Sequence, residues 1–165
     1  MAVDKNQAVL DWLSTCPQVK NNPLFFNFIN AKDENKQFVT VSNDIIIDKP
    51  YIDGSVMKRY TFTLIDFKSI SYNPIVKNLG TSTSTLSNEN VEEMLDTQGI
   101  IDWIREQEES HSYPNFGSDC DIDELIVTNN TPMLNGIDST TTPSLAQYGL
   151  TVYINYIDNT KKLWR

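Results

Sequence analysis

Two stretches of the chain place an apolar side chain at every second position, which is the period of a β-strand. In residues 148–157 these positions are Tyr148, Leu150, Val152, Ile154 and Tyr156. In residues 58–67 they are Tyr60, Phe62 and Leu64, which alternate with Thr61, Thr63 and Ile65. A chain with two such stretches needs a sheet with an apolar face, and another layer has to cover that face.

Two segments have the apolar spacing of helices and can form this layer. Residues 4–16 begin at Asp4, a suitable N-cap, and end at Cys16-Pro17, because the residue before proline disfavours helical geometry. Their apolar stripe consists of Ala8, Val9, Trp12 and Leu13. Residues 89–109 form the second helix, in which Gly99 indicates a kink or close packing. The stripe of this helix consists of Val91, Met94, Leu95, Ile101 and Ile104, flanked by Trp103.

Shorter patterns predict the other elements. Residues 24–29 read as a strand, and a turn at 33–36 leads into a return strand at 38–41, which residues 45–47 extend or follow. Asp53-Gly54 predicts a turn before the strand at 58–67. Residues 122–128 form a further strand. Segments 69–88 and 129–145 are rich in Ser, Thr, Asn and Pro, and we expect them to be mobile loops.

The resulting order is α-β-β-β-α-β-β, which predicts an α+β fold. We expect an antiparallel or mixed sheet of about five strands, with both helices packed on one side. Residues 1–165 show no internal repeat and no linker, so we expect a single domain.

The charge of the chain excludes several partners. Its formal net charge is −9 and its pI about 4.5, whereas nucleic-acid binders neutralise phosphates with Lys and Arg. Between residues 89 and 124 there are 12 acidic side chains and one basic one, Arg105.

No secretory signal or membrane-spanning run is visible, and Cys16 and Cys120 form no CxxC motif. We therefore expect synthesis in a reducing cytoplasm and no membrane partner.

A search for chemistry finds no catalytic, cofactor or metal motif. His111, the one histidine, lies between two serines, but a triad requires spatial geometry, and a surface loop is the simpler interpretation. The acidic string at 119–124 would need Gly and Glu at the sixth and twelfth positions of an EF-hand loop, where it has Glu124 and Asn130. We therefore expect that the chain is not an enzyme and that it holds no cofactor and no metal ion.

Three tryptophans differ in their expected roles. Trp12 and Trp103 lie on apolar helix stripes and are predicted core residues. Leu163, Trp164 and Arg165 follow the last strand. This group is either a clamp on the same molecule or a contact to a neighbouring subunit or partner.

Several phrases occur in an order that resembles a known family. They are Asp11-Trp12-Leu13, Asn22-Pro23-Leu24-Phe25-Phe26-Asn27-Phe28-Ile29-Asn30, Tyr51-Ile52-Asp53-Gly54-Ser55, Gly99-Ile100-Ile101-Asp102-Trp103-Ile104, Cys120-Asp121-Ile122-Asp123 and Tyr153-Ile154-Asn155-Tyr156-Ile157. Together they resemble the tail terminator (tail completion, or minor capsid) proteins of long-tailed bacteriophages of Gram-positive hosts. The resemblance covers nearly the whole chain, and its motifs are structural.

The resemblance implies a virion protein that is assembled in the host cytoplasm into a hexameric ring. Such a ring caps the head-proximal end of the tail tube, stops tube polymerisation and offers a docking surface to the neck proteins. DNA passes through it without specific binding. We therefore expect acidic side chains to line the lumen, since basic ones would retain phosphates. The candidates are Glu106, Glu108, Glu109, Asp119, Asp121 and Asp123.

Two other functions stay open at this point. Another component of the head-tail connector, such as a head-completion stopper, would also be a small acidic ring former. The other alternative is a cytosolic enzyme or ligand-binding domain with an unfamiliar site, and an activity screen of the purified monomer would identify it.

Overall fold

The computed structural model describes residues 3–27, 37–41, 48–70, 89–161 and 163, and it confirms the α+β fold. Within these ranges, two helices and seven strands follow one another. They are α1 (Lys5–Leu13), β1 (Leu24–Phe26), β2 (Gln37–Val41), β3 (Asp48–Pro50), β4 (Val56–Ser69), α2 (Glu89–Glu109), β5 (Cys120–Val127), β6 (Met133–Asp138) and β7 (Leu145–Asp158).

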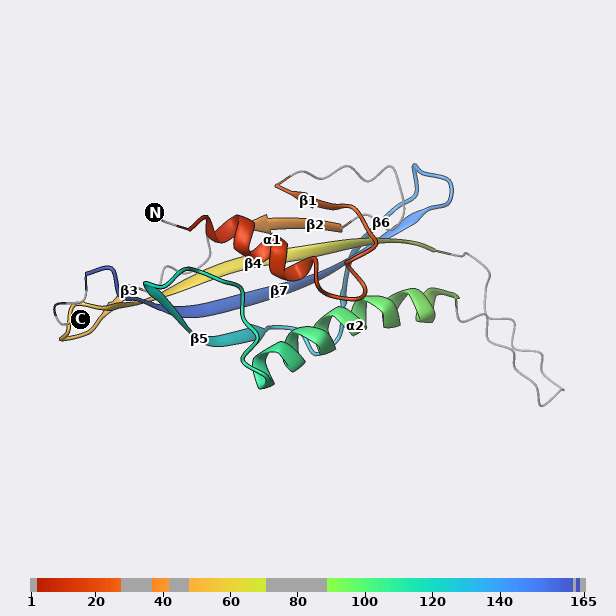
Figure 1. The fold of residues 1–165 in the computed structure, drawn as a ribbon. Helices are drawn as coiled ribbons and strands as arrows, with labels where there is room; N and C mark the ends of the chain where they lie inside the picture. The colour runs from red at the N-terminus through yellow and green to blue at the C-terminus, as the bar shows by residue number, and fades with distance from the viewer. Residues whose placement is uncertain (1–2, 28–36, 42–47, 71–88, 162, 164–165) are drawn as a thin grey trace, which may run out of the picture.

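The sheet is built around β4 and β7, the two long strands that the alternation predicted. They pair antiparallel from Val56 opposite Asp158 to Ser69 opposite Leu145. The sheet order is β1-β2-β4-β7-β5, while β3 pairs with β4 and β6 with β7. The outer edge of β4 therefore carries β2 and β3 in tandem, and the outer edge of β7 carries β5 and β6. As a result, β3 lies at one end of the β4–β7 ladder and β6 at the other (Figure 1).

The main core lies between one face of this sheet and both helices, and a smaller cluster around Phe67 and Leu145 lies on the other face. The even-numbered residues of β4 and β7 point to the helix-covered face, so Phe62 and Leu64 lie beside Val152 and Leu150 and are fully buried. Helix α1 contributes Val9, Trp12 and Leu13, and α2 contributes Ile100, Ile101 and Ile104. The rings of Trp12 and Trp103 are 4.8 Å apart between centroids, so both helices pack on one side of the sheet, as predicted.

The helix predictions hold, except that α1 ends at Leu13 instead of Cys16 and that one residue of α2 was assigned to the wrong face. Asp4 caps α1 by accepting a hydrogen bond from the backbone N–H of Asn6 at 2.9 Å. Gly99 confirms close packing, because a Cβ there would lie 2.5 Å from Nε2 of Gln18. The placement of Leu95 on the buried stripe is wrong, since 57% of this residue is exposed. It falls outside the positions at which α2 faces the sheet.

The predicted return strand after β1 is wrong in direction. Leu24 pairs with Gln37 and Phe26 with Val39, so β1 and β2 run parallel. A tight turn joins only antiparallel neighbours, so a simple hairpin cannot make this connection. The predicted turn at 33–36 and the segment 45–47 lie outside the described residues, and β3 at Asp48–Pro50 was not predicted.

The predicted loop at 129–145 is also wrong in part, because it contains β6. The first strand on the outer edge of β7, β5, ends opposite Val152, which leaves residues 145–149 of β7 open to a second strand. Residues 133–138 fill this edge despite their irregular sequence. The other predicted loop spans residues 69–88. Residues 71–88 of it lie outside the described residues, and its first residue, Ser69, is the last residue of β4.

Candidate functional site

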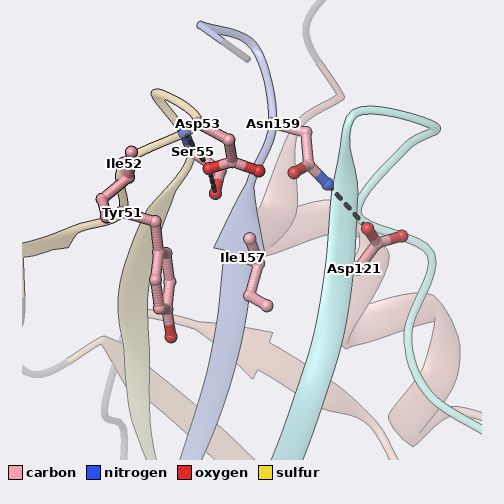
Figure 2. Close-up of a pocket in the computed structure, with 7 residues that line it drawn as sticks. All are labelled: Tyr51, Ile52, Asp53, Ser55, Asp121, Ile157 and Asn159. Carbon is pink, nitrogen blue, oxygen red and sulfur yellow. Dashed lines mark hydrogen bonds between the residues drawn. The ribbon is translucent and has the colours of Figure 1, made fainter. Parts of the chain in front are cut away.

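One end of the ladder forms a tip with an open cavity of about 540 Å³. The turn before β4 and the ends of β5 and β7 supply its lining. Figure 2 shows the ring of Tyr51 lying beside Ile157, while Asp121 accepts a hydrogen bond from Asn159 at 2.6 Å. Ile52, next to Tyr51 in the turn, is fully exposed. The tip therefore combines an apolar outer surface with carboxylates held by local hydrogen bonds.

The segment after β7 folds back onto this tip. The backbone N–H of Leu163 donates to the carbonyl of Asp53 at 2.8 Å. The predicted turn is present: Gly54 donates to the carbonyl of Tyr51, and its φ of 86° favours glycine. Leu163 contacts its own chain through its backbone, yet the residue is 69% exposed and accessible to a partner. Trp164 and Arg165 lie outside the described residues.

Replacement of Gly54 by alanine is expected to destabilise the tip. A Cβ at Gly54 would lie 2.5 Å from the backbone oxygen of Lys161, and the positive φ adds about 1–2 kcal/mol of strain. We expect faster hydrogen exchange in residues 158–161 and at Leu163, and a lower urea midpoint. Gly136→Ala is the control, since a Cβ there meets no atom within 4 Å. Equal exchange in the two variants would contradict the docking of this segment.

The six predicted lumen acids lie on both sides of β5. Glu106 and Glu109 are exposed on α2, whereas Asp121 pairs with Ile157 on the sheet face opposite the helices. Asp123 is the extra residue of a bulge between Ile122 and Glu124 and is exposed, and Asp119 is half-buried in the turn before β5. These side chains follow the β5 edge as a band, and the structure does not gather them onto one face.

Glu108, another of the six predicted lumen acids, makes a structural contact. Its Oε2 accepts a hydrogen bond from the backbone N–H of Leu125 at 2.8 Å, which ties α2 to β5. The pKa of Tyr113 is raised by burial and by the nearby carboxylates of Glu108, Asp123 and Glu124. The acid band is therefore densest where the end of α2 meets β5.

The residues considered for catalysis and calcium binding have other partners. His111 is exposed just after α2, and its Nδ1 lies 3.0 Å from the carbonyl of Glu108 and 3.2 Å from the hydroxyl of Tyr113. The neighbouring Ser110 donates to the hydroxyl of Ser112. Within the described ranges, no group of three or more His, Cys, Asp or Glu side chains is placed to hold a metal ion.

The other end of the ladder carries an apolar surface that the sequence reasoning missed. Met133, Leu134 and Ile137 of β6 are 56%, 51% and 50% exposed. One sequence pattern could have revealed this surface. Two adjacent large apolar residues and a third shortly after them lie inside a segment that is otherwise rich in Thr, Asn and Pro. Such exposure on an edge strand is typical of an interaction surface.

A buried ionic cluster between β4 and α2 was also missed. Asp66 is fully buried, and its Oδ2 accepts a hydrogen bond from the hydroxyl of Thr97 at 2.8 Å and lies 3.8 Å from Nζ of Lys68. Lys68, 3% exposed, also contacts Asp96 and Glu93. Burial raises the pKa of Asp66 to about 6, although Lys68 and Thr97 oppose the rise. Burial alone would lower the pKa of Lys68, but the surrounding carboxylates raise it.

Neither helix in the described part of the chain is long and apolar enough to cross a membrane. No protein-family model matches the chain, and no curated protein matches it significantly in sequence.

Proposed function

We propose that the chain is a structural protein of a long-tailed bacteriophage virion. In this proposal six copies form a ring that caps the head-proximal end of the tail tube and stops its polymerisation. The ring also provides the surface on which the head-neck proteins dock. The ordered phrases that resemble tail terminator proteins suggest this role, and no catalytic residue takes part in it.

The observation that carries the proposal is the position of the exposed apolar side chains. Six of the eight large apolar side chains exposed in the described ranges lie at the two ends of the ladder. They are Tyr51, Ile52 and Leu163 at the tip and Met133, Leu134 and Ile137 on β6. Clustered apolar residues mark contact surfaces, and two different surfaces on one subunit suit the head-to-tail contacts of a ring.

The charge distribution suits a DNA conduit. Phosphate contacts to Lys and Arg release counterions and retain DNA, whereas carboxylates repel it. The acid band along β5 contains Asp121, Asp123 and Glu124, all of them exposed. An inner wall formed by this band would let DNA pass without holding it.

The proposal is tested by electron microscopy and sedimentation of the purified chain, alone and mixed with tail tubes of its phage. We expect rings of six subunits that sit at one end of each tube and halt its growth when tube protein is added. A monomer that ignores tube ends would contradict the proposal. Rings that bind portal complexes instead of tubes would identify a head-completion stopper.

A further inference from the structure

Strand β6 has one partner among the described strands. It pairs with the end of β7, from Met133 opposite Gly149 to Asp138 opposite Leu145. Its other edge faces away from β7, and the N–H and C=O groups of an open edge can pair with a strand of another chain. Leu134 and Ile137 flank this edge on the helix-covered face, and Met133 lies on the opposite face.

The sequence around β6 is almost free of charge. Residues 125–157 contain a single charged side chain, Asp138, although the chain has 35 charged residues, 13 basic and 22 acidic. Strand β6 and the part of β7 beside it are therefore nearly free of charge, while β5 carries the acid band. The charged groups at this end of the ladder belong to β4 and α2, where Asp66, Glu93 and Asp96 surround Lys68. This difference bears on which kind of partner can bind at β6.

A nucleic acid or an anionic membrane requires Lys or Arg beside the contact, and residues 125–157 contain neither. Arg105 of α2 reaches Asn129 and Asn130 before β6, but these residues and Asp102 engage its guanidinium group. Two copies of a chain with net charge −9 repel each other over most of their surfaces. The repulsion is weakest where charge is absent, so a second copy is best accommodated along the β6 edge, where Asp138 is the one charged residue. There it gains both apolar burial and strand pairing.

We infer that the β6 edge is the surface through which one copy of this chain contacts the next. This inference rests on the proposed ring and assigns one side of its subunit contact. In a closed ring of six copies, the β6 edge meets a different surface of the neighbour, since pairing of β6 with β6 would stop at a dimer.

The test introduces a carboxylate into β6 in the full chain. Leu134→Glu and Ile137→Glu change half-exposed side chains, so the fold should persist, and circular dichroism checks it. Leu95→Glu is the matched control, with the same change in charge at a residue 57% exposed on α2. We expect each β6 variant to raise the concentration for half-assembly about tenfold or more, with the control unchanged. Sedimentation velocity measures this concentration.

A second measurement uses the unmodified chain. Amides of residues 133–138 should become protected from hydrogen exchange when the concentration is raised into the assembled range. Unchanged exchange in β6 during assembly would overturn the inference.

The outcomes separate this inference from the proposed function. Rings that persist in both β6 variants, or that are lost equally in Leu95→Glu, overturn the β6 contact and leave the ring proposal intact. A dimer that the β6 variants dissociate supports the contact and overturns the ring. If the chain stays monomeric and caps tubes only when β6 is intact, the inference that a second copy binds β6 is overturned. The partner at β6 is then the tube protein. A monomer without tube binding overturns both.

Discussion

Replacement of Trp12 by alanine is expected to lower the free energy of unfolding by about 3–5 kcal/mol. Trp12 is 8% exposed, and its ring packs against Trp103 at 4.8 Å, so its removal opens a cavity between α1 and α2. Its indole N–H also donates to the carbonyl of Ser112 at 2.8 Å, which ties α1 to the segment after α2. Urea unfolding followed by far-ultraviolet circular dichroism measures the loss.

Two further variants separate the contributions to this effect. Trp12→Phe keeps an aromatic ring and removes the indole hydrogen bond, so we expect an intermediate loss of about 1–3 kcal/mol. Leu95→Ala changes an exposed residue and should stay within about 0.5 kcal/mol of the unmodified chain. A loss below about 1 kcal/mol for Trp12→Ala would show that the two helices are held by other contacts.

The elements that the sequence predicted well are those with one face buried against the other layer along most of their length. Phe62 and Leu64 on β4, like Leu150 and Val152 on β7, are buried against the helices and repeat every second residue. Helix α1 is equally clear, because Asp4 caps it and its buried residues lie on one stripe. In these segments the period follows directly from burial.

The short strands could not be predicted, because the sheet decides where they lie. Strand β6 has exposed apolar residues and a bulge between Leu134 and Gly136, so it shows no clean alternation. Its position follows from the part of β7 that β5 leaves unpaired, which is a tertiary property. The parallel pairing of β1 with β2 likewise depends on the place that β2 takes beside β4.

The candidate site was predictable in composition but not in placement. Counting acids locates the charge between residues 89 and 124, yet it cannot tell that Asp121 lies on the face opposite α2 while Glu106 lies on α2 itself. From the sequence, Leu163 could belong to a clamp on the same molecule or to a contact with a neighbouring subunit or partner. Its backbone contact with Asp53 required the folded tip.

Asp66 and Lys68 could have been found from the period alone. They continue the even-numbered series of Tyr60, Phe62 and Leu64, so the alternation points both of them toward the helix-covered face. A carboxylate and an ammonium on a buried face need partners. Helix α2 supplies them through Thr97 and Asp96.

The raised pKa of Asp66 makes stability depend on pH. Because the pKa rises from 3.8 to about 6 on folding, the folded chain holds this proton more tightly than the unfolded chain. The stabilisation is complete below pH 3.8 and is lost as the pH rises through about 6, by at most about 3 kcal/mol. Asp66→Asn should remove this loss, which urea unfolding at several pH values between about 4 and 7 would show.

Replacement of Lys68 by methionine is expected to cost about 3–5 kcal/mol near pH 8, where the buried Asp66 is ionised and loses its neighbouring ammonium. Near pH 5 the cost should be much smaller, because Asp66 is then protonated in the unmodified chain as well. The double variant Asp66→Asn/Lys68→Met should recover most of the loss, since it leaves no buried carboxylate at β4. Urea unfolding followed by tryptophan fluorescence gives these free energies. A cost that is equal at both pH values would show that Lys68 acts through Asp96 and Glu93 at the end of α2, and not through Asp66.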